Sequence, residues 1–170
     1  MTTIEQTEVN QWVDKLKSQL TEMLGDELLQ SAMIGIRTGG AELGQRLHRE
    51  FGLTQPFGQL NISFYRDDFS KIGLHPQVGA SDIPFEVDEK TIILVDDVLQ
   101  SGRTVRAALN EIFDYGRPSR VILAVLVDRG GRELPIRPDA LGHLINLDAN
   151  AHLKLNAEDM SFQILDNRTS

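Results

Sequence analysis

The chain contains no cysteine among its 170 residues, which excludes disulfides, thiolate metal sites and a cysteine nucleophile. It also has no apolar run near the roughly 20 residues that a membrane-spanning helix needs. Its N-terminus has neither the basic stretch nor the long apolar stretch of a signal peptide. We therefore expect a cytoplasmic protein without a membrane partner.

Positive charge is scarce as well. The 17 Lys and Arg residues face 25 Asp and Glu residues, so the net charge is −8 and the isoelectric point about 4.9. Such a chain does not attract nucleic acid as a whole, although its basic residues could still cluster on one face. The length predicts a single domain, residues 1–170, with a sizeable core.

One segment stands out by the order of its residue types. An unbroken apolar run at 91–95 leads into Asp96 and Asp97, and a short polar loop with Gly102 follows. The run is typical of a strand buried on both faces, and open α/β sheets bind ligands where such strands end. The next helix should bury one face, which carries Val105, Ala108, Leu109, Ile112 and Phe113.

The chemistry of this segment indicates a site for a ribose 5-phosphate. The free N–H groups at the start of a helix are suited to a phosphate. Carboxylates such as Asp96 and Asp97 accept hydrogen bonds from sugar hydroxyls. The loop lacks the lysine and the spacing of a Walker A motif, and no G-x-G-x-x-G follows the strand.

The remaining pattern predicts an α/β fold with a central, mostly parallel sheet flanked by helices. Helices are expected at 7–24, with Trp12 and Met23 in the core, and at 41–51. Strands are expected at 32–36, 60–65, 121–127, 144–147 and 162–165. Residues 67–84 show no periodicity and should form a flexible lid loop.

Polar side chains follow three of these strands. They form the groups Arg37-Thr38-Gly39-Gly40, Asp96-Asp97 and Asp128-Arg129-Gly130. Because parallel strands end at one edge of their sheet, the three groups should meet there.

Residues 91–104 resemble the phosphoribosyl-pyrophosphate (PRPP) signature of type I phosphoribosyltransferases. Further motifs resemble the pyrimidine operon regulator family (PyrR), whose members are also uracil phosphoribosyltransferases. These motifs are Tyr65-Arg66-Asp67-Asp68, residues 82–85, Gly116-Arg117-Pro118, residues 123–130 and residues 132–137. The similarity runs from about residue 34 to about residue 142. It implies the type I phosphoribosyltransferase fold and the reaction of uracil with PRPP to UMP and pyrophosphate, with Mg2+ bound together with PRPP.

The resemblance also implies roles for residues. Asp96 and Asp97 would contact the ribose hydroxyls, directly or through metal-bound water, with Mg2+ near them. Arg66 would neutralise charge on the leaving group. Arg37, Thr38, Gly39 and Gly40 would receive the pyrophosphate. Ser101, Gly102 and Thr104, with the backbone N–H groups of the loop, would hold the 5-phosphate. The PRPP-binding stretch would also include Val98, Leu99, Gln100 and Arg103. Val127, Asp128, Arg129 and Gly130 would lie near the uracil.

Some alternatives stay open. Arg66 could form a surface ion pair, Arg103 could brace the loop, and Asp128 could cap its turn. Gly39 stands where the family often has arginine, and Gly131 where it often has histidine. The second change and the mixed charges of the first helix weaken the RNA binding found in the family.

Two other functions therefore compete with uracil transfer. One is an RNA-binding attenuator that senses UMP or PRPP at this site, for which Arg117, Arg120, Arg132 and Arg137 would supply the basic patch. The other is transfer to a different base. A homo-oligomer, either a dimer or a tetramer, is expected.

Overall fold

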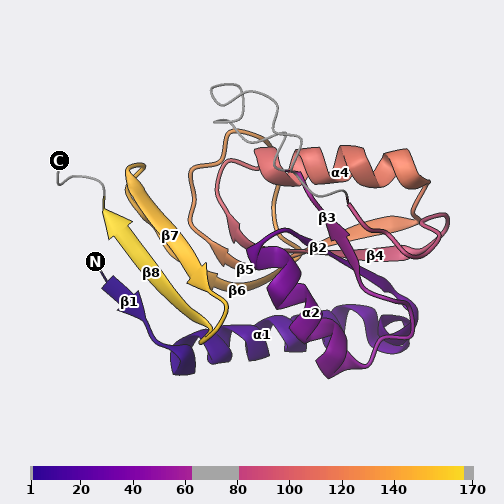
Figure 1. Ribbon diagram of the computed structural model, residues 1–170, viewed down its shortest axis with the longest axis horizontal. Helices are drawn as coiled ribbons and strands as arrows, with labels where there is room; N and C mark the ends of the chain where they lie inside the picture. The colour runs from indigo at the N-terminus through magenta and orange to yellow at the C-terminus, as the bar shows by residue number, and fades with distance from the viewer. Residues whose placement is uncertain (1, 63–80, 167–170) are drawn as a thin grey trace.

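The computed structural model describes residues 2–62 and 81–166, and they form two sheets (Figure 1). The larger sheet has the strand order β3-β2-β4-β5-β6, and all its neighbouring strands are parallel. Its strands are β2 (Ala32–Ile36), β3 (Gly58–Leu60), β4 (Thr91–Leu99), β5 (Arg120–Asp128) and β6 (Ala140–Leu144). The α/β class and the parallel central sheet are thus confirmed.

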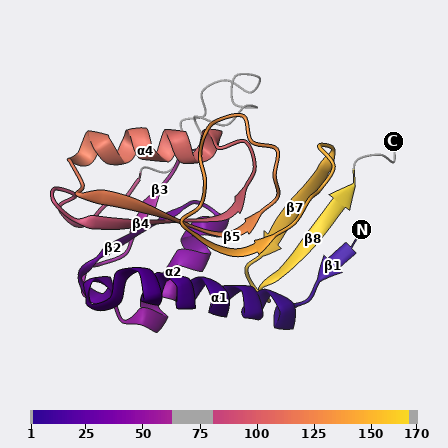
Figure 2. The same ribbon diagram turned by 180° about the vertical axis from the view of Figure 1, so that it is seen from behind.

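Helices cover both faces of this sheet, as Figures 1 and 2 show from opposite sides. On one face lie α1 (Gln6–Leu24) and α2 (Gly39–Phe51), with the short 3-10 helix η1 (Gly25–Gln30) after α1. On the other face lies α4 (Arg103–Tyr115). Ile93 and Val95 pack on the α1 side, whereas Ile92 and Leu94 pack on the α4 side. Both faces of β4 are buried, so the apolar run shows no alternation.

The strand at 32–36 and the first two helices lie where the sequence predicts them, to within two residues. Two side chains expected in the core lie outside it: Phe113 is 56% exposed and Met23 is 39% exposed. The buried face of α4 is centred on Val105, Ala108 and Ile112, and Phe113 lies at the edge of this face. Met23 lies beside the stripe of α1 in its last turn.

The strand predicted at 144–147 was misplaced, because the structure has β6 at Ala140–Leu144 and leaves Leu144 61% exposed. β6 is an edge strand, and a side chain of α1 provides the hydrogen-bond partners that a further strand would otherwise provide. The Gln19 side-chain amide donates to the Leu141 carbonyl at 2.9 Å, and its oxygen accepts from the Leu141 N–H at 2.8 Å. Hydrogen bonding to a side chain from α1 thus satisfies this part of the exposed edge.

The smaller sheet is antiparallel, with the order β1-β8-β7. It consists of β1 (Thr2–Ile4), β7 (Ala151–Asn156) and β8 (Ser161–Asp166), and it places the first described strand beside the last (Figure 1). The predicted strand at 162–165 corresponds to β8, whereas β1 and β7 were not predicted. None of the helices in the described residues is long and apolar enough to cross a membrane.

Candidate active site

The three polar groups meet at the carboxyl edge of the parallel sheet, around two neighbouring hollows. The first, which we call the turn cavity, has a volume of about 350 Å3. It is lined by Arg37, Thr38, Gly39, Glu42, Asp96, Asp97, Leu153, Lys154 and Leu155. The second, the loop cavity, has a volume of about 400 Å3. It is lined by Gln100, Ser101, Arg129, Gly130, Gly131, Glu133, Leu147 and Ala149.

The acidic pair lies inside β4, because pairing with β5 continues to Leu99 and Asp128. Asp96 is only 5% exposed, and its Oδ1 accepts a hydrogen bond from the Asp97 N–H at 2.9 Å. Asp97 is half-buried and accepts in the same way from the Val98 N–H at 2.9 Å. The backbone therefore orients both carboxylates beside the turn cavity.

The glycine pair explains how α2 can lie so close to these acids. A Cβ atom on Gly39 would fall 2.0 Å from Oδ2 of Asp97, and one on Gly40 would fall 2.6 Å from the Val95 carbonyl oxygen. A Cβ atom at position 39 would require the Asp97 side chain to move, and one at position 40 would require the backbone of β4 to move. The peptide bond between Arg37 and Thr38 is cis. α2 begins at Gly39, so the N–H groups of its first turn lie at this edge without carbonyl partners inside the helix.

The loop expected to hold a phosphate is shorter than predicted. Val98 and Leu99 belong to β4, where Leu99 is 2% exposed, and the loop comprises Gln100 to Gly102. Gly102 has the positive φ of 93°, and α4 begins at the next residue. The Ser101 hydroxyl accepts a hydrogen bond from the Arg103 N–H at 3.1 Å. The loop therefore leads into the N-terminus of a 13-residue helix.

The segment 132–137 braces this loop, a role that its sequence did not reveal. The N–H groups of Glu133 and Leu134 both donate to the Ser101 carbonyl, at 2.9 and 3.1 Å. Arg132 donates to the Gln100 carbonyl at 2.9 Å, and Arg103 pairs with Glu133 at 2.9 Å. The sequence pointed to this segment only through the family resemblance. Its bracing role could not be predicted, because hydrogen bonds between backbone groups do not require particular residue types.

Asp128 caps the turn that follows β5, which was one of the two roles considered for it. Its Oδ1 accepts from the Gly130 N–H at 3.0 Å, and its Oδ2 accepts from Arg132 at 2.6 Å. Burial alone would raise the pKa of Asp128, but the hydrogen bond from Arg132, the Gly130 N–H and the charge of Arg132 together lower it. Asp128 therefore stays ionised and holds the turn together with Arg132.

Arg129 connects this turn to the smaller sheet. Its guanidinium donates to the carbonyl oxygens of Ala151 at 2.7 Å and Asp148 at 2.9 Å, and the residue is 5% exposed. Burial lowers its pKa. The two carbonyl bonds fix β7 and the residues before it relative to the end of β5.

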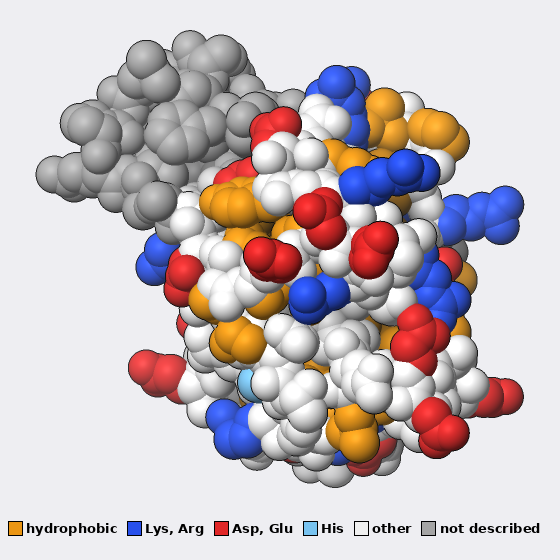
Figure 3. Space-filling model, turned by 90° about the vertical axis from the view of Figure 1, so that its right-hand side faces the viewer, with side chains coloured by type: hydrophobic (Ala, Val, Ile, Leu, Met, Phe, Trp, Pro, Cys, Tyr) orange, Lys and Arg blue, Asp and Glu red, His pale blue; other side chains and the backbone are white. Residues whose placement is uncertain are grey.

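Two expectations from the sequence, the lid with Arg66 and the basic patch for RNA, do not form part of the site described above. Arg66 and most of the lid segment fall at 63–80, outside the described residues. Of the four arginines considered for RNA, Arg120 pairs with Glu27 at 2.8 Å and Arg132 is engaged by Asp128. On the face in Figure 3, basic and acidic side chains are interspersed. Neither observation favours a continuous basic surface.

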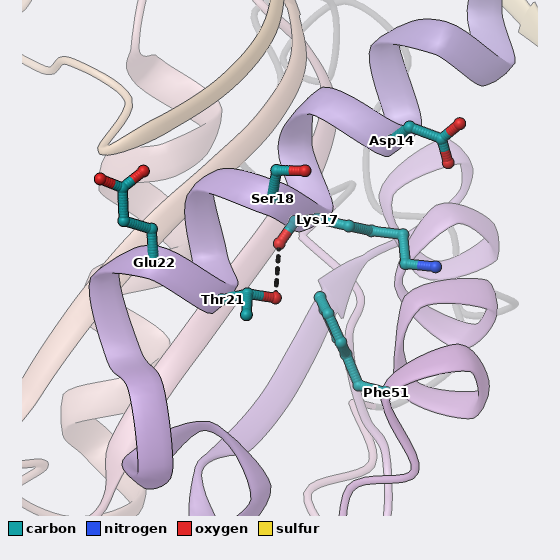
Figure 4. Close-up of a pocket in the computed structure, with 6 residues that line it drawn as sticks. All are labelled: Asp14, Lys17, Ser18, Thr21, Glu22 and Phe51. Atoms are coloured by element: carbon teal, nitrogen blue, oxygen red, sulfur yellow. Dashed lines mark hydrogen bonds between the residues drawn. The ribbon is translucent and has the colours of Figure 1, made fainter.

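A third hollow of about 530 Å3 lies away from this edge, over α1 and the end of α2 (Figure 4). Its cation, Lys17, pairs with Glu50 at 2.9 Å and lies 5.9 Å from the ring centre of Phe51. Burial would raise the pKa of Glu50, but hydrogen bonds from Lys17 and Arg46 lower it. The charge of Lys17 is therefore already balanced by Glu50. We accordingly place the candidate active site at the carboxyl edge of the sheet and not in this third hollow.

Comparison with known proteins identifies the class. Residues 5–155 match the family model of the phosphoribosyl transferase domain. A hypoxanthine-guanine-xanthine phosphoribosyltransferase superposes with a TM-score of 0.68, covering 96% of this chain and 93% of that one at 16% identity. A hypoxanthine-guanine phosphoribosyltransferase of Bacillus anthracis gives 0.67, covering 84% and 82% at 18% identity. At such identities these structures establish the fold, which is that of the phosphoribosyl transferases.

Closer relatives define the family within this class. The bifunctional protein PyrR of Nitrosococcus oceani is 54% identical over 149 residues, covering 85% of this chain and 84% of that protein. The bifunctional protein PyrR of Pseudomonas entomophila is 56% identical over 129 residues, covering 76% and 75%. The chain therefore belongs to the PyrR family of phosphoribosyl transferases, as the sequence motifs predict.

Proposed function

We propose that this protein is a uracil phosphoribosyltransferase, which converts uracil and PRPP to UMP and pyrophosphate. The observation that carries the proposal is the placement of Arg37–Gly39 and Asp96–Asp97 around one cavity, with the loop at Gln100–Gly102 adjoining the next. This order along the sheet edge matches the order of pyrophosphate, ribose and 5-phosphate in PRPP.

Each part of the edge suits one part of the substrate. The N–H groups of the loop and of the first turn of α4, with the hydroxyls of Ser101 and Thr104, bind the 5-phosphate. The carboxylates of Asp96 and Asp97 accept hydrogen bonds from the ribose hydroxyls. Arg37, Thr38 and the N–H groups of Gly39 and Gly40 bind the pyrophosphate. Val98 and Leu99 lie within β4, where the Val98 N–H donates to Asp97 and the Leu99 carbonyl accepts from the Arg129 N–H, so these two residues position the loop.

We propose that magnesium binds together with PRPP, near Asp96 and Asp97. The described residues contain no group of three or more His, Asp or Glu side chains placed to hold a metal ion. Mg2+ commonly takes one or two carboxylates together with substrate phosphates, which fits Asp96 and Asp97. When bound, it neutralises phosphate charge.

The reaction forms a bond from uracil N1 to the ribose C1′ while the bond from C1′ to the pyrophosphate oxygen breaks with its electron pair, and the N1 proton passes to the released pyrophosphate or to water. The protein contributes mainly by holding both reactants and by stabilising charge on the leaving group. The base lies beside Val127–Gly130 at the loop cavity. Since the side chains of Asp128 and Arg129 are engaged within the protein, the backbone of this stretch reads the uracil edge.

An assay of nucleotide formation from PRPP with uracil, hypoxanthine or orotate tests the proposal. Product from uracil alone is expected, and product from another base alone would identify a different transferase. Asp97→Asn should fold normally yet lose about ten- to a hundredfold in kcat/KM, because it removes a charged hydrogen bond of about 1.5–3 kcal/mol. A folded Asp97→Asn protein with unchanged kcat/KM for PRPP would contradict the assignment of this residue.

A second function, regulation through RNA, is favoured by the word bifunctional in the names of the relatives. We propose that such binding is weak here, because Arg120 and Arg132 are engaged by Glu27 and Asp128. The whole chain, residues 1–170, would act as one catalytic domain in a dimer or tetramer. Sedimentation of the purified protein tests the assembly.

A further inference from the structure

The pyrophosphate turn cannot supply a second cation from position 39. The Cβ position of Gly39 lies 2.0 Å from Oδ2 and 2.5 Å from Cγ of Asp97. An arginine there, as the resembling family often has, would displace the carboxylate that faces the ribose. With Gly39 in place, Arg37 is the basic side chain that this turn itself brings to the cavity.

A different element brings another cation to the same cavity. β7 is an edge strand that pairs with β8 alone, and three of its consecutive residues, Leu153, Lys154 and Leu155, line the turn cavity. Lys154 is exposed. Within residues 2–62 and 81–166 it has no hydrogen-bond or ion-pair partner, whereas Lys17, Arg46, Arg103, Arg120 and Arg132 are all paired with carboxylates.

The charges around the cavity show why this lysine matters. Arg37 and Lys154 are opposed by Glu42, Asp96 and Asp97, so the lining carries one more negative than positive charge. Pyrophosphate brings several further negative charges, even when Mg2+ accompanies it. An anion at this place gains from each cation that lines the cavity, and Lys154 brings its charge from β7, a different element from the Arg37 turn.

β7 is also held firmly enough to position a ligand group. Its residues Ala151–Asn156 pair with β8 along their whole length, and Arg129 binds the Ala151 carbonyl at 2.7 Å. The side chain of Lys154 therefore extends from a strand that is fixed relative to the end of β5.

We propose that Lys154 binds the pyrophosphate group of PRPP and of the product, in place of a basic side chain at position 39. The inference rests on the proposed function, since it assumes that the turn cavity receives pyrophosphate. It assigns to the smaller sheet a direct part in binding the leaving group.

Calorimetric titration with magnesium pyrophosphate and with UMP, alongside steady-state kinetics, tests the inference. Lys154→Ala should raise the Kd for magnesium pyrophosphate and the KM for PRPP by about three- to tenfold, the range of a partly exposed charged contact. The Kd for UMP and the KM for uracil should stay unchanged, and Lys154→Arg should restore wild-type values. Lys90→Ala, which removes the same charge just before β4 at the opposite edge of the sheet, is the matched control.

The outcomes separate the two proposals. Equal pyrophosphate affinity in Lys154→Ala and Lys90→Ala would overturn the role of Lys154. A parallel loss of UMP and pyrophosphate affinity in Lys154→Ala would also overturn it, because it would indicate a structural effect. If the wild-type protein makes no UMP, the proposed function fails, while the pyrophosphate titration still decides whether Lys154 binds this anion. Circular dichroism of Lys154→Ala and Lys154→Arg shows whether both variants are folded.

Discussion

Replacing each of the two neighbouring glycines by alanine should produce two different defects. On Gly39 the new methyl group would fall 2.0 Å from Oδ2 of Asp97, the free end of a side chain. On Gly40 it would fall 2.6 Å from the Val95 carbonyl oxygen and 3.0 Å from the Asp96 Cα, both of which belong to the backbone of β4. A side chain can rotate away, whereas a central strand cannot move without disturbing its neighbours.

Gly39→Ala should therefore impair activity while leaving the fold stable. Turning Asp97 away removes a charged hydrogen bond to the ribose of about 1.5–3 kcal/mol, which predicts about a ten- to hundredfold loss of kcat/KM for PRPP. The free energy of unfolding should hardly fall. Alanine lowers the conformational entropy of the unfolded chain, which stabilises the folded protein by about 0.4–1 kcal/mol and offsets part of the strain.

Gly40→Ala should instead destabilise the protein. Overpacking against a fixed backbone costs about 1–3 kcal/mol, which corresponds to a fall in Tm of roughly 2–12 °C for a domain of this size. Urea unfolding and UMP synthesis, measured on both variants, separate the two defects. Wild-type kcat/KM in Gly39→Ala, or an unchanged Tm in Gly40→Ala, would show that α2 does not approach β4 as closely as described.

Three further substitutions or titrations test the surrounding contacts. Arg132→Ala should lower the free energy of unfolding by about 1–3 kcal/mol and raise the KM for PRPP, since it removes the hydrogen bond to Gln100 and leaves Asp128 without its cation; an unchanged KM would refute the bracing role. Asp128→Asn should cost a similar amount at neutral pH. A pKa lowered in the folded state stabilises the protein only while the carboxyl is ionised, so this cost should shrink as the pH falls below the ordinary value of 3.8, and urea unfolding from about pH 7 to about pH 3 measures it. Leader RNA of the pyrimidine operon should bind weakly with a shallow salt dependence in filter titrations, and tight binding stimulated by UMP would contradict this expectation.

The parts of the fold that the sequence predicted are those governed by local pattern. The run at 91–95 is apolar at every position because both faces of β4 are buried, and the spacing in α1 follows its contact with the sheet. β1 and β7 were missed for the same reason. β1 has only three residues, and β7 is a short strand in which Ala151, Leu153 and Leu155 alternate with polar residues and form no continuous apolar run.

The residues of the candidate site could be proposed from the sequence where their residue types suggest the chemistry, and not where close contacts between elements matter. Asp96, Asp97 and Ser101 stand out in a sequence because their functional groups are unusual after a buried strand. The need for glycine at 39 and 40 depends on the approach of α2 to β4, which no spacing encodes. The same holds for Lys154, which lies 57 positions from Asp97 in the chain and borders the same cavity.

The polar groups at this edge fall into two sets, which has a consequence for how the site can change. The side chains of Asp128, Arg129 and Arg132 form their hydrogen bonds with groups of the protein itself, so they fix the positions of the loop and of β7. Arg37, Asp97 and Lys154 line the turn cavity, where we propose that they contact the ligand. Because the braces, and not the ligand-facing groups, fix the backbone, a cation can be lost at position 39 and supplied from β7 without rebuilding the sheet edge. Substitutions in the first set should therefore change stability and activity together, whereas substitution of Lys154 in the second set should change activity alone.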